Sequence, residues 1–188
     1  MKSEAEKTVL FLCTGNYYRS RLAELLFNHY AETLELPWHA LSMGLAQQMH
    51  WKGISPCALQ YLEQRQLIFP PEKVLRDPIP VTLEDVEQAE AIVLLNRSEH
   101  QIMMSQRFGL VAKVFEERGR LRYWNVYDIP RTSGWLERFF QVFGSAGFQR
   151  EESGTEHVDF AVQSLVRELS EESNELMVAD TQNATGNT

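Results

Sequence analysis

The fold of this chain is decided by the stretch VLFLCTGNYYRS, residues 9–20. Its first four residues are apolar and predict a strand that is covered on both faces, as in a parallel sheet. The apolar positions 22, 23, 25, 26 and 30 then follow a helical period and predict an amphipathic helix packed on that sheet. Between the two elements lies a tight loop that begins with Cys13 and ends with Arg19.

The spacing of Cys13 and Arg19 suits chemistry on an oxyanion. A loop that enters a helix points several backbone N–H groups into one concavity, and the helix dipole adds positive potential there. The Cys13 thiol at the edge of this concavity is expected to ionise readily and to act as a nucleophile. The planar guanidinium of Arg19 can hold two oxygens of a phosphoryl group. The spacing alone leaves open that Cys13 is a buried structural cysteine.

The residues inside the loop favour the oxyanion site. Gly15 allows a positive φ and a close approach of the backbone, and Asn16 tolerates the same turn. Ser20 can cap the helix or donate a hydrogen bond to the thiolate, which would make sulfur a better leaving group. We therefore predict that the whole loop binds the substrate. Its binding residues would be Thr14, Gly15, Asn16, Tyr17, Tyr18 and Ser20.

Residues 9–24 resemble the signature of the low-molecular-weight protein tyrosine phosphatase family. That signature is a strand, then Cys-x-Gly-Asn-x-Cys-Arg-Ser-Pro, then a helix with Ala-Glu. Tyr18 stands where the family often has a second cysteine, and Arg21 stands where it has proline. The first change removes the usual thiol partner for reversible oxidative protection, but it leaves phosphate chemistry untouched. The resemblance implies that phosphotyrosine is the default substrate.

We expect an α/β fold with three layers, in which a four-stranded parallel sheet of order 2-1-3-4 has helices on both faces. Strands are predicted at about 8–12, 38–43, 91–95 and 122–127, and strand–helix–strand order favours right-handed crossovers. A single domain would cover residues 1–177. Its last helix would run from about Thr155 to Leu176, and the polar residues 178–188 would form a disordered tail.

Cleavage of a phosphoester needs an acid that protonates the leaving oxygen. In an open parallel sheet ligands bind beyond the carboxyl ends of the strands, and both Cys13 and Asp128 follow a predicted strand. Asp77 precedes the third strand, so it is expected at the opposite edge, and we assign the acid to Asp128. The resemblance agrees, because the family carries its acid in an Asp-Pro loop after its fourth strand; here Ile129 separates Asp128 from Pro130. The alternative is an ordinary turn residue.

The resemblance also suggests a wall of the cleft and a brace for the loop. The family has an aromatic residue near the position of Trp51, which would flank an aryl phosphate; a core position is the alternative. His100 would brace Asn16, because the family often has a histidine that supports this asparagine; a surface histidine is the alternative. Cys57 is expected to be a packing residue.

The composition limits partners and location. The chain has 188 residues and a net charge of −8, which argues against nucleic acid as its main partner. Two cysteines give no disulfide framework, and a reactive thiol suits a reducing compartment. No signal peptide or membrane span is evident, so the predicted location is the cytoplasm. We expect a monomer or weak dimer with no membrane partner, no cofactor and no metal, because arginine and amides supply the positive charge.

The favoured function is that of a phosphomonoesterase, acting as a protein tyrosine phosphatase through a cysteinyl-phosphate intermediate. Its partner would be a phosphorylated protein or a small aryl phosphate. Arsenate reduction is one alternative, but Cys57 has no nearby cysteine in the sequence, so only a version that uses an external thiol is open. A module that binds phosphate or phosphopeptides without turnover is the other, because the acid loop and Arg21 depart from the family pattern.

Overall fold

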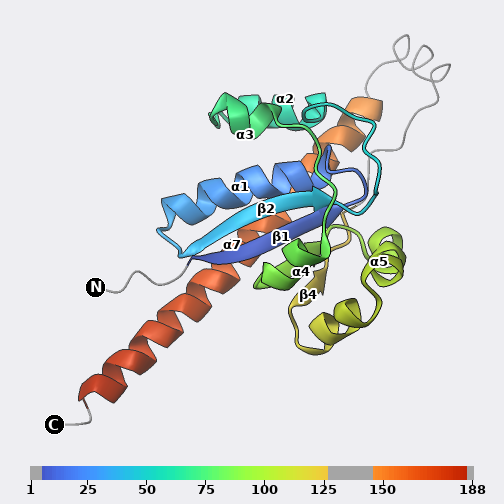
Figure 1. The fold of residues 1–188 in the computed structure, drawn as a ribbon. Helices are drawn as coiled ribbons and strands as arrows, with labels where there is room; N and C mark the ends of the chain where they lie inside the picture. The colour runs from blue at the N-terminus through green and yellow to red at the C-terminus, as the bar shows by residue number, and fades with distance from the viewer. Residues whose placement is uncertain (1–5, 127–145, 186–188) are drawn as a thin grey trace.

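The chain folds around four parallel strands in the order β2-β1-β3-β4 (Figure 1). The computed structural model describes residues 6–126 and 146–185, and within the second range the side chains of residues 154–173. The strands are β1 (Lys7–Cys13), β2 (Trp38–Gly44), β3 (Ala91–Leu94) and β4 (Leu121–Tyr123). The predicted fold class and strand order are therefore confirmed.

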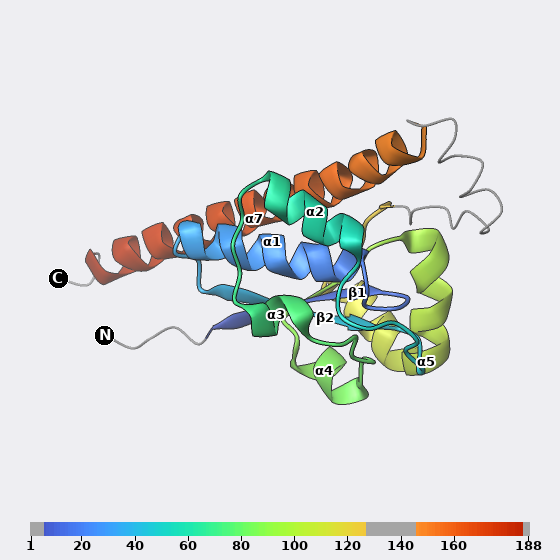
Figure 2. The same cartoon turned by 90° about the horizontal axis from the view of Figure 1, so that it is seen from above.

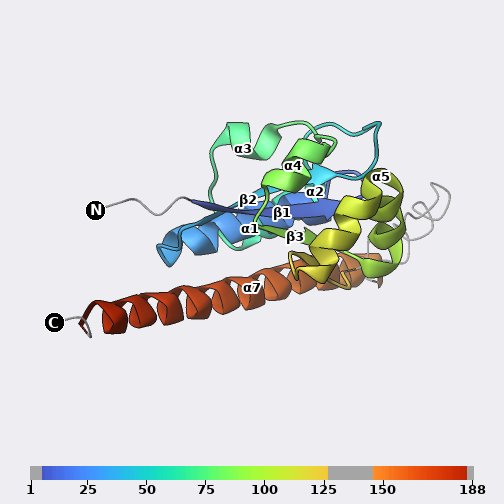
Figure 3. The same cartoon turned by 60° about the horizontal axis from the view of Figure 1, so that its bottom comes forward.

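Helices cover both faces of the sheet. They are α1 (Arg19–Thr33), α2 (Pro56–Gln64), α3 (Pro71–Leu75), α4 (Leu83–Gln88), α5 (Arg97–Glu117) and α7 (Ala146–Thr185). Figures 2 and 3 show α1 and α7 on one side of the sheet, with α4 and α5 on the other. None of the helices in the described residues is both long and apolar enough to cross a membrane.

Strand β1 supplies both cores, because its side chains alternate between the two faces. Val9 and Phe11 are fully buried on the side of α1 and α7. Leu10 and Leu12 are buried on the side of α4 and α5. β1 pairs with β2 over its full length, from Lys7 opposite Trp38 to Cys13 opposite Gly44. β3 pairs with the other side of β1 as far as Leu12, so the carboxyl end of β1 lies inside the sheet.

Helix α5 runs to Glu117 through a kink at Gly109, whose φ of 45° and ψ of −113° only glycine adopts at low cost. Two other elements differ from the sequence prediction. Strand β4 ends at Tyr123 instead of residue 127. Helix α7 begins at Ala146 and runs to Thr185, which includes most of the predicted disordered tail. After Gly154, neither glycine nor proline interrupts the sequence before Gly186, so nothing in the backbone stops this helix.

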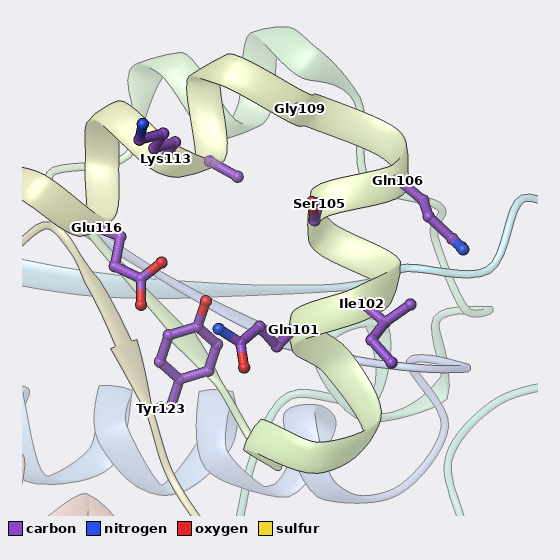
Figure 4. A pocket seen from close by; sticks show the side chains of 9 residues that line it. Gln101, Ile102, Ser105, Gln106, Gly109, Lys113, Glu116 and Tyr123 are labelled. Atoms are coloured by element: carbon purple, nitrogen blue, oxygen red, sulfur yellow. The ribbon is translucent and has the colours of Figure 1, made fainter.

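The bend of α5 encloses a surface hollow of about 430 Å³ (Figure 4). Its lining comes from α5 and from Tyr123 of β4, and the side chains of Gln101, Lys113 and Glu116 border it. Cys13 and the other residues of the 13–20 loop are absent from this lining. The hollow therefore does not belong to the predicted oxyanion site.

A buried carboxylate joins α7 to the helices beside it. Asp159 is only 2% exposed, and its oxygens accept hydrogen bonds from the hydroxyls of Tyr30 in α1 and Tyr61 in α2, both at 2.7 Å. Arg65 lies 3.3 Å from the same carboxylate. Burial, together with these hydrogen bonds, raises the pKa of Tyr30 to about 12 and raises the pKa of Tyr61 as well. One side chain thus links three helices.

We predict that Asp159→Ala lowers the free energy of unfolding by about 3 kcal/mol, because it leaves two buried hydroxyls and a guanidinium without their acceptor. Urea denaturation measures this change. Glu168→Ala is the control, since Glu168 pairs with Arg122 at an exposed position and its loss should change stability by less than about 1 kcal/mol. An Asp159→Ala variant as stable as the control would contradict this account of how α7 is held.

Candidate active site

The loop between β1 and α1 is buried and carries the predicted nucleophile. Cys13 is the last residue of β1 and is 3% exposed, and Arg19 is the first residue of α1. The Cys13 Sγ atom lies 3.0 Å from Ser20 Oγ. When the thiol is ionised, the Ser20 hydroxyl must be the donor in this contact, which stabilises negative charge on sulfur. The structure therefore joins Cys13 and Ser20 as the sequence predicts.

Asn16 holds this loop in shape. It is fully buried and has a φ of 48°, in the left-handed region. Its Nδ2 donates to Ser20 Oγ at 3.1 Å and to Ser42 Oγ at 2.9 Å, and its Oδ1 accepts from Arg76 and from the Ile79 amide, both at 3.0 Å. All hydrogen-bonding positions of this side chain are satisfied. The costly backbone conformation is thus maintained by four contacts from three different segments.

Arg19 connects the loop to α5 and to the segment after β4. Its guanidinium is 2% exposed, donates to the Val126 carbonyl at 3.1 Å and pairs with Glu99 at 2.8 Å. Asn96 also donates to the Val126 carbonyl, at 3.3 Å. A carboxylate and a carbonyl therefore fix the orientation of the planar guanidinium. Binding of an oxyanion by Arg19 stays a prediction.

Two further arginines, Arg21 and Arg76, lie near the loop. Arg21 is fully buried and donates to the carbonyls of Lys73 and Val74 at 2.7 and 3.0 Å. Arg76 pairs with Glu24 at 2.6 Å, and Arg21 lies 3.5 Å from the same carboxylate. Burial, and secondly the charge of Arg76, lower the pKa of Arg21 to about 10. Arg21 is thus accommodated where the resembling family has proline, because it caps the end of α3.

An aromatic pair stands beside the loop. The rings of Tyr17 and Trp51 are stacked, with centroids 5.8 Å apart. Trp51 also lies against Gly15, where a Cβ atom would come within 2.5 Å of the indole Cζ3. Trp51 is half-buried, so it is neither a core residue nor a fully exposed one. The structure brings Gly15, Tyr17 and Trp51 together, so glycine is required here for close approach of the ring.

The remaining predicted loop residues have other surroundings. Tyr18 is 6% exposed and belongs to the core on the α1 side. The Thr14 hydroxyl donates to Met103 Sδ at 3.9 Å. Asp128 lies outside the described residues. Cys57 is a partly buried residue packed against the core on the α1 side, as expected.

The prediction that His100 braces Asn16 is wrong. His100 is fully buried, and its Nδ1 accepts the Asn96 amide at 3.0 Å, so its proton resides on Nε2, 3.5 Å from Glu99. Asn16 is braced instead by serine and arginine side chains and by a backbone amide. The error arises because the sequence places His100 one turn into α5, whereas Asn16 faces β2 and the segment before α4.

The prediction that Asp77 lies at the opposite edge of the sheet is also wrong. The Gly44 amide donates to the Ile79 carbonyl at 2.8 Å, and the Val81 amide donates to the Gly44 carbonyl at 2.9 Å. The segment before α4 therefore lies beside the carboxyl end of β2, and α4 returns the chain to the start of β3. Hydrogen bonds from Lys52 and from the Gly53 amide lower the pKa of Asp77. Both carboxylate oxygens of Asp77 accept these hydrogen bonds, and Asp128 stays the predicted acid.

Sequence reasoning missed several residues around the loop. Ser42, Glu24, Arg76 and Glu99 lie in β2, α1, the segment after α3 and α5, and all contact the loop or its supports. Glu24 belongs to the Ala-Glu of the family signature, although its contacts were not predicted. Ser42, Arg76 and Glu99 belong to no local motif, so no signal in one sequence identifies them. The burial of Arg21 could have been predicted from the sequence. It lies four residues before the buried Leu25 and therefore on the same, packed face of α1.

Comparison with known proteins agrees with this geometry. The family model for low molecular weight phosphotyrosine protein phosphatase matches residues 8–128. The chain belongs to this family. Membership favours phosphate ester hydrolysis over the two alternatives, arsenate reduction and binding without turnover. As a member of the low-molecular-weight phosphatase family, the chain is a phosphatase hydrolase.

Individual relatives include phosphatases with two different substrates in their names. A protein-arginine-phosphatase of Bacillus subtilis (strain 168) is 30% identical over 107 residues, which cover 57% of this chain and 67% of that protein. A low molecular weight phosphotyrosine phosphatase from Vibrio cholerae O395 has a similar structure, with a TM-score of 0.65, 19% identity and coverage of 88% of this chain and 98% of that one. An arginine phosphatase from Geobacillus stearothermophilus has a TM-score of 0.63, 17% identity and coverage of 90% and 96%.

We predict that His100 makes the stability of this site region depend on pH. Burial, and secondly the charge of Arg19, lower the pKa of His100 to about 4. Between pH 6.5 and 4 the unfolded chain therefore binds a proton that the folded chain does not, and stability falls as the pH falls. The loss should amount to about 3 kcal/mol between pH 7 and pH 4.

Urea denaturation as a function of pH measures this slope in the wild type and in His100→Asn, which keeps an acceptor for the Asn96 amide. The variant should lose about 3 kcal/mol less than the wild type over this range. Equal slopes in the two proteins would show that His100 is not the buried neutral group described above.

Proposed function

We propose that this chain is a protein tyrosine phosphatase that works through a cysteinyl-phosphate intermediate at Cys13. The single observation that carries the proposal is the contact of Cys13 Sγ with Ser20 Oγ at 3.0 Å inside the loop that Asn16 braces. The contact supports the proposal because a nucleophile, a hydroxyl donor and the start of a helix would then lie together. These groups suit a substrate that is an oxyanion and has an electrophilic phosphorus atom.

In the first step the Cys13 thiolate attacks phosphorus, and the bond from phosphorus to the leaving oxygen breaks. Backbone amides of residues 14–19 and the Arg19 guanidinium hold the three equatorial oxygens while charge moves onto them. Asp128 gives its proton to the leaving oxygen. In support of this role, Asp128 follows Val126 by two residues in the sequence, and the Val126 carbonyl accepts from Arg19 at 3.1 Å.

In the second step a water molecule attacks the cysteinyl phosphate. The Asp128 carboxylate takes a proton from this water, and the bond from sulfur to phosphorus breaks to release inorganic phosphate. The Ser20 hydroxyl stabilises the departing thiolate. Asp128 acts as acid in the first step and as base in the second, so the enzyme returns to its starting state.

We predict that Cys13→Ser abolishes hydrolysis of p-nitrophenyl phosphate and that Asp128→Ala lowers kcat by roughly 10²-fold or more. Release of p-nitrophenol measures both. Arg19→Lys keeps the charge but loses the planar fork, so it should also lower activity strongly. Robust turnover by Cys13→Ser would rule out the covalent mechanism. A wild-type protein that binds inorganic phosphate without turnover would favour a binding module.

The proposed substrate class is an aryl phosphate on a protein, because Tyr17 and Trp51 stack beside the loop and Trp51 is half-buried. A planar aromatic leaving group packs favourably on such a wall. The second candidate is phosphoarginine, since a relative 30% identical to this chain is a protein-arginine-phosphatase. A planar guanidino group could contact the same rings.

We predict that kcat/KM for a phosphotyrosine peptide exceeds that for the matched phosphoarginine and phosphoserine peptides by at least about tenfold, equivalent to about 1.4 kcal/mol of transition-state binding. Release of inorganic phosphate from the three peptides under the same conditions measures the order. A preference for phosphoarginine would replace the proposed substrate but retain the cysteinyl-phosphate mechanism.

A further inference from the structure

The loop between β1 and α1, residues 13–20, is called the phosphate loop below. The loop after β2 is hydrogen-bonded to its backbone at both ends. The Leu45 amide donates to the Cys13 carbonyl at 2.8 Å, and the Ala46 amide donates to the Thr14 carbonyl at 2.9 Å. At the other end, the Ser55 amide donates to the Tyr17 carbonyl at 2.9 Å. Between these ties lies Trp51, so the conformation of residues 47–54 determines where its ring stands.

Asp77 holds this middle part of the loop. One carboxylate oxygen accepts the Gly53 amide at 3.0 Å, and the other accepts the Lys52 ammonium at 2.7 Å. These are the two residues that directly follow Trp51. Gly53 has a φ of 62°, so the chain turns sharply at the residue whose amide Asp77 binds. The carboxylate thus restrains the turn that directs Trp51 toward the phosphate loop.

The residues on either side of Asp77 are hydrogen-bonded to the phosphate loop. The residue before it, Arg76, and a residue shortly after it, Ile79, both donate to Asn16 Oδ1 at 3.0 Å. A continuous path therefore runs from Asn16 through this segment to Asp77 and on to Gly53. The ion pair with Lys52 is exposed and contributes little by itself, so the restraint comes chiefly from the bond to the Gly53 amide.

We propose that Asp77 is a positioning residue that sets the Trp51 wall and thereby the selectivity for aryl phosphates. This inference rests on the proposed function, in which an aryl group lies against Trp51 and Tyr17. Asp77 does not touch the phosphoryl group in this scheme. It fixes the distance between the aromatic wall and an anion site that is formed without it.

The test separates ring binding from anion binding in the full-length protein. We expect Asp77→Ala to raise KM for p-nitrophenyl phosphate about tenfold while the inhibition constant of inorganic phosphate changes less than about twofold. Asp77→Asn keeps an oxygen acceptor for the Gly53 amide and should stay near the wild type. Asp85→Ala is the matched control, because Asp85 is an exposed aspartate that accepts the Thr82 amide in the cap of α4. It should leave both constants unchanged.

A double-mutant cycle with Trp51→Ala gives the readout that a merely structural role would not move. If Asp77 acts through Trp51, Asp77→Ala causes no further rise of KM in the Trp51→Ala background. Three outcomes would overturn the proposal: Asp77→Ala behaving like Asp85→Ala, additive effects of the two substitutions, or an equal loss of phosphate affinity. If Asp77→Ala does not fold, Asp77→Asn decides, and a tenfold rise of its KM refutes the role of the Gly53 bond.

Failure of the proposed function has a different signature. In that case the wild-type protein shows no turnover of p-nitrophenyl phosphate, and no variant restores it. A wild-type enzyme that is active and an Asp77→Ala enzyme that is indistinguishable from it would refute only the positioning role.

Discussion

The structure depends on the way in which the Asn16 side chain is bound. A residue other than glycine in the left-handed region costs free energy, and Asn16 maintains a φ of 48° while fully buried. Two serine hydroxyls, one guanidinium and one backbone amide satisfy its side chain. These partners come from α1, β2 and the segment between α3 and α4. The shape of the phosphate loop is therefore a tertiary property, although its residues are adjacent in sequence.

Buried charge is the second constraint. Arg19 pairs with Glu99, and Arg76 pairs with Glu24, while Arg21 donates to backbone carbonyls at the end of α3. A buried cation is tolerated only when such partners replace its water. In a chain of net charge −8, three arginines and the carboxylates of Glu24 and Glu99 gather around one loop, so cations outnumber anions by one among these side chains. They lie near the start of α1.

Local sequence was sufficient for the strand, the loop and the helix that contain Cys13 and Arg19, because the apolar pattern and the turn residues agree there. The sheet order was also predicted correctly, because the same stretch resembles a family whose fold has this order. It failed for Asp77, because α4 lies between this residue and β3 and reverses the direction that chain order suggests. It failed for His100 and did not identify Arg76, because a hydrogen bond between distant segments leaves no periodic pattern. The part that could not be predicted is the support of the loop, which long-range contacts build.

The most direct test of this account is the affinity for inorganic phosphate of the wild type and of Asn16→Ala, measured by isothermal titration calorimetry. If the bonds of Asn16 shape the anion site, the variant should keep its helical circular dichroism and bind phosphate at least about tenfold more weakly, a loss of about 1.4 kcal/mol. A folded Asn16→Ala protein with the affinity of the wild type would contradict the account.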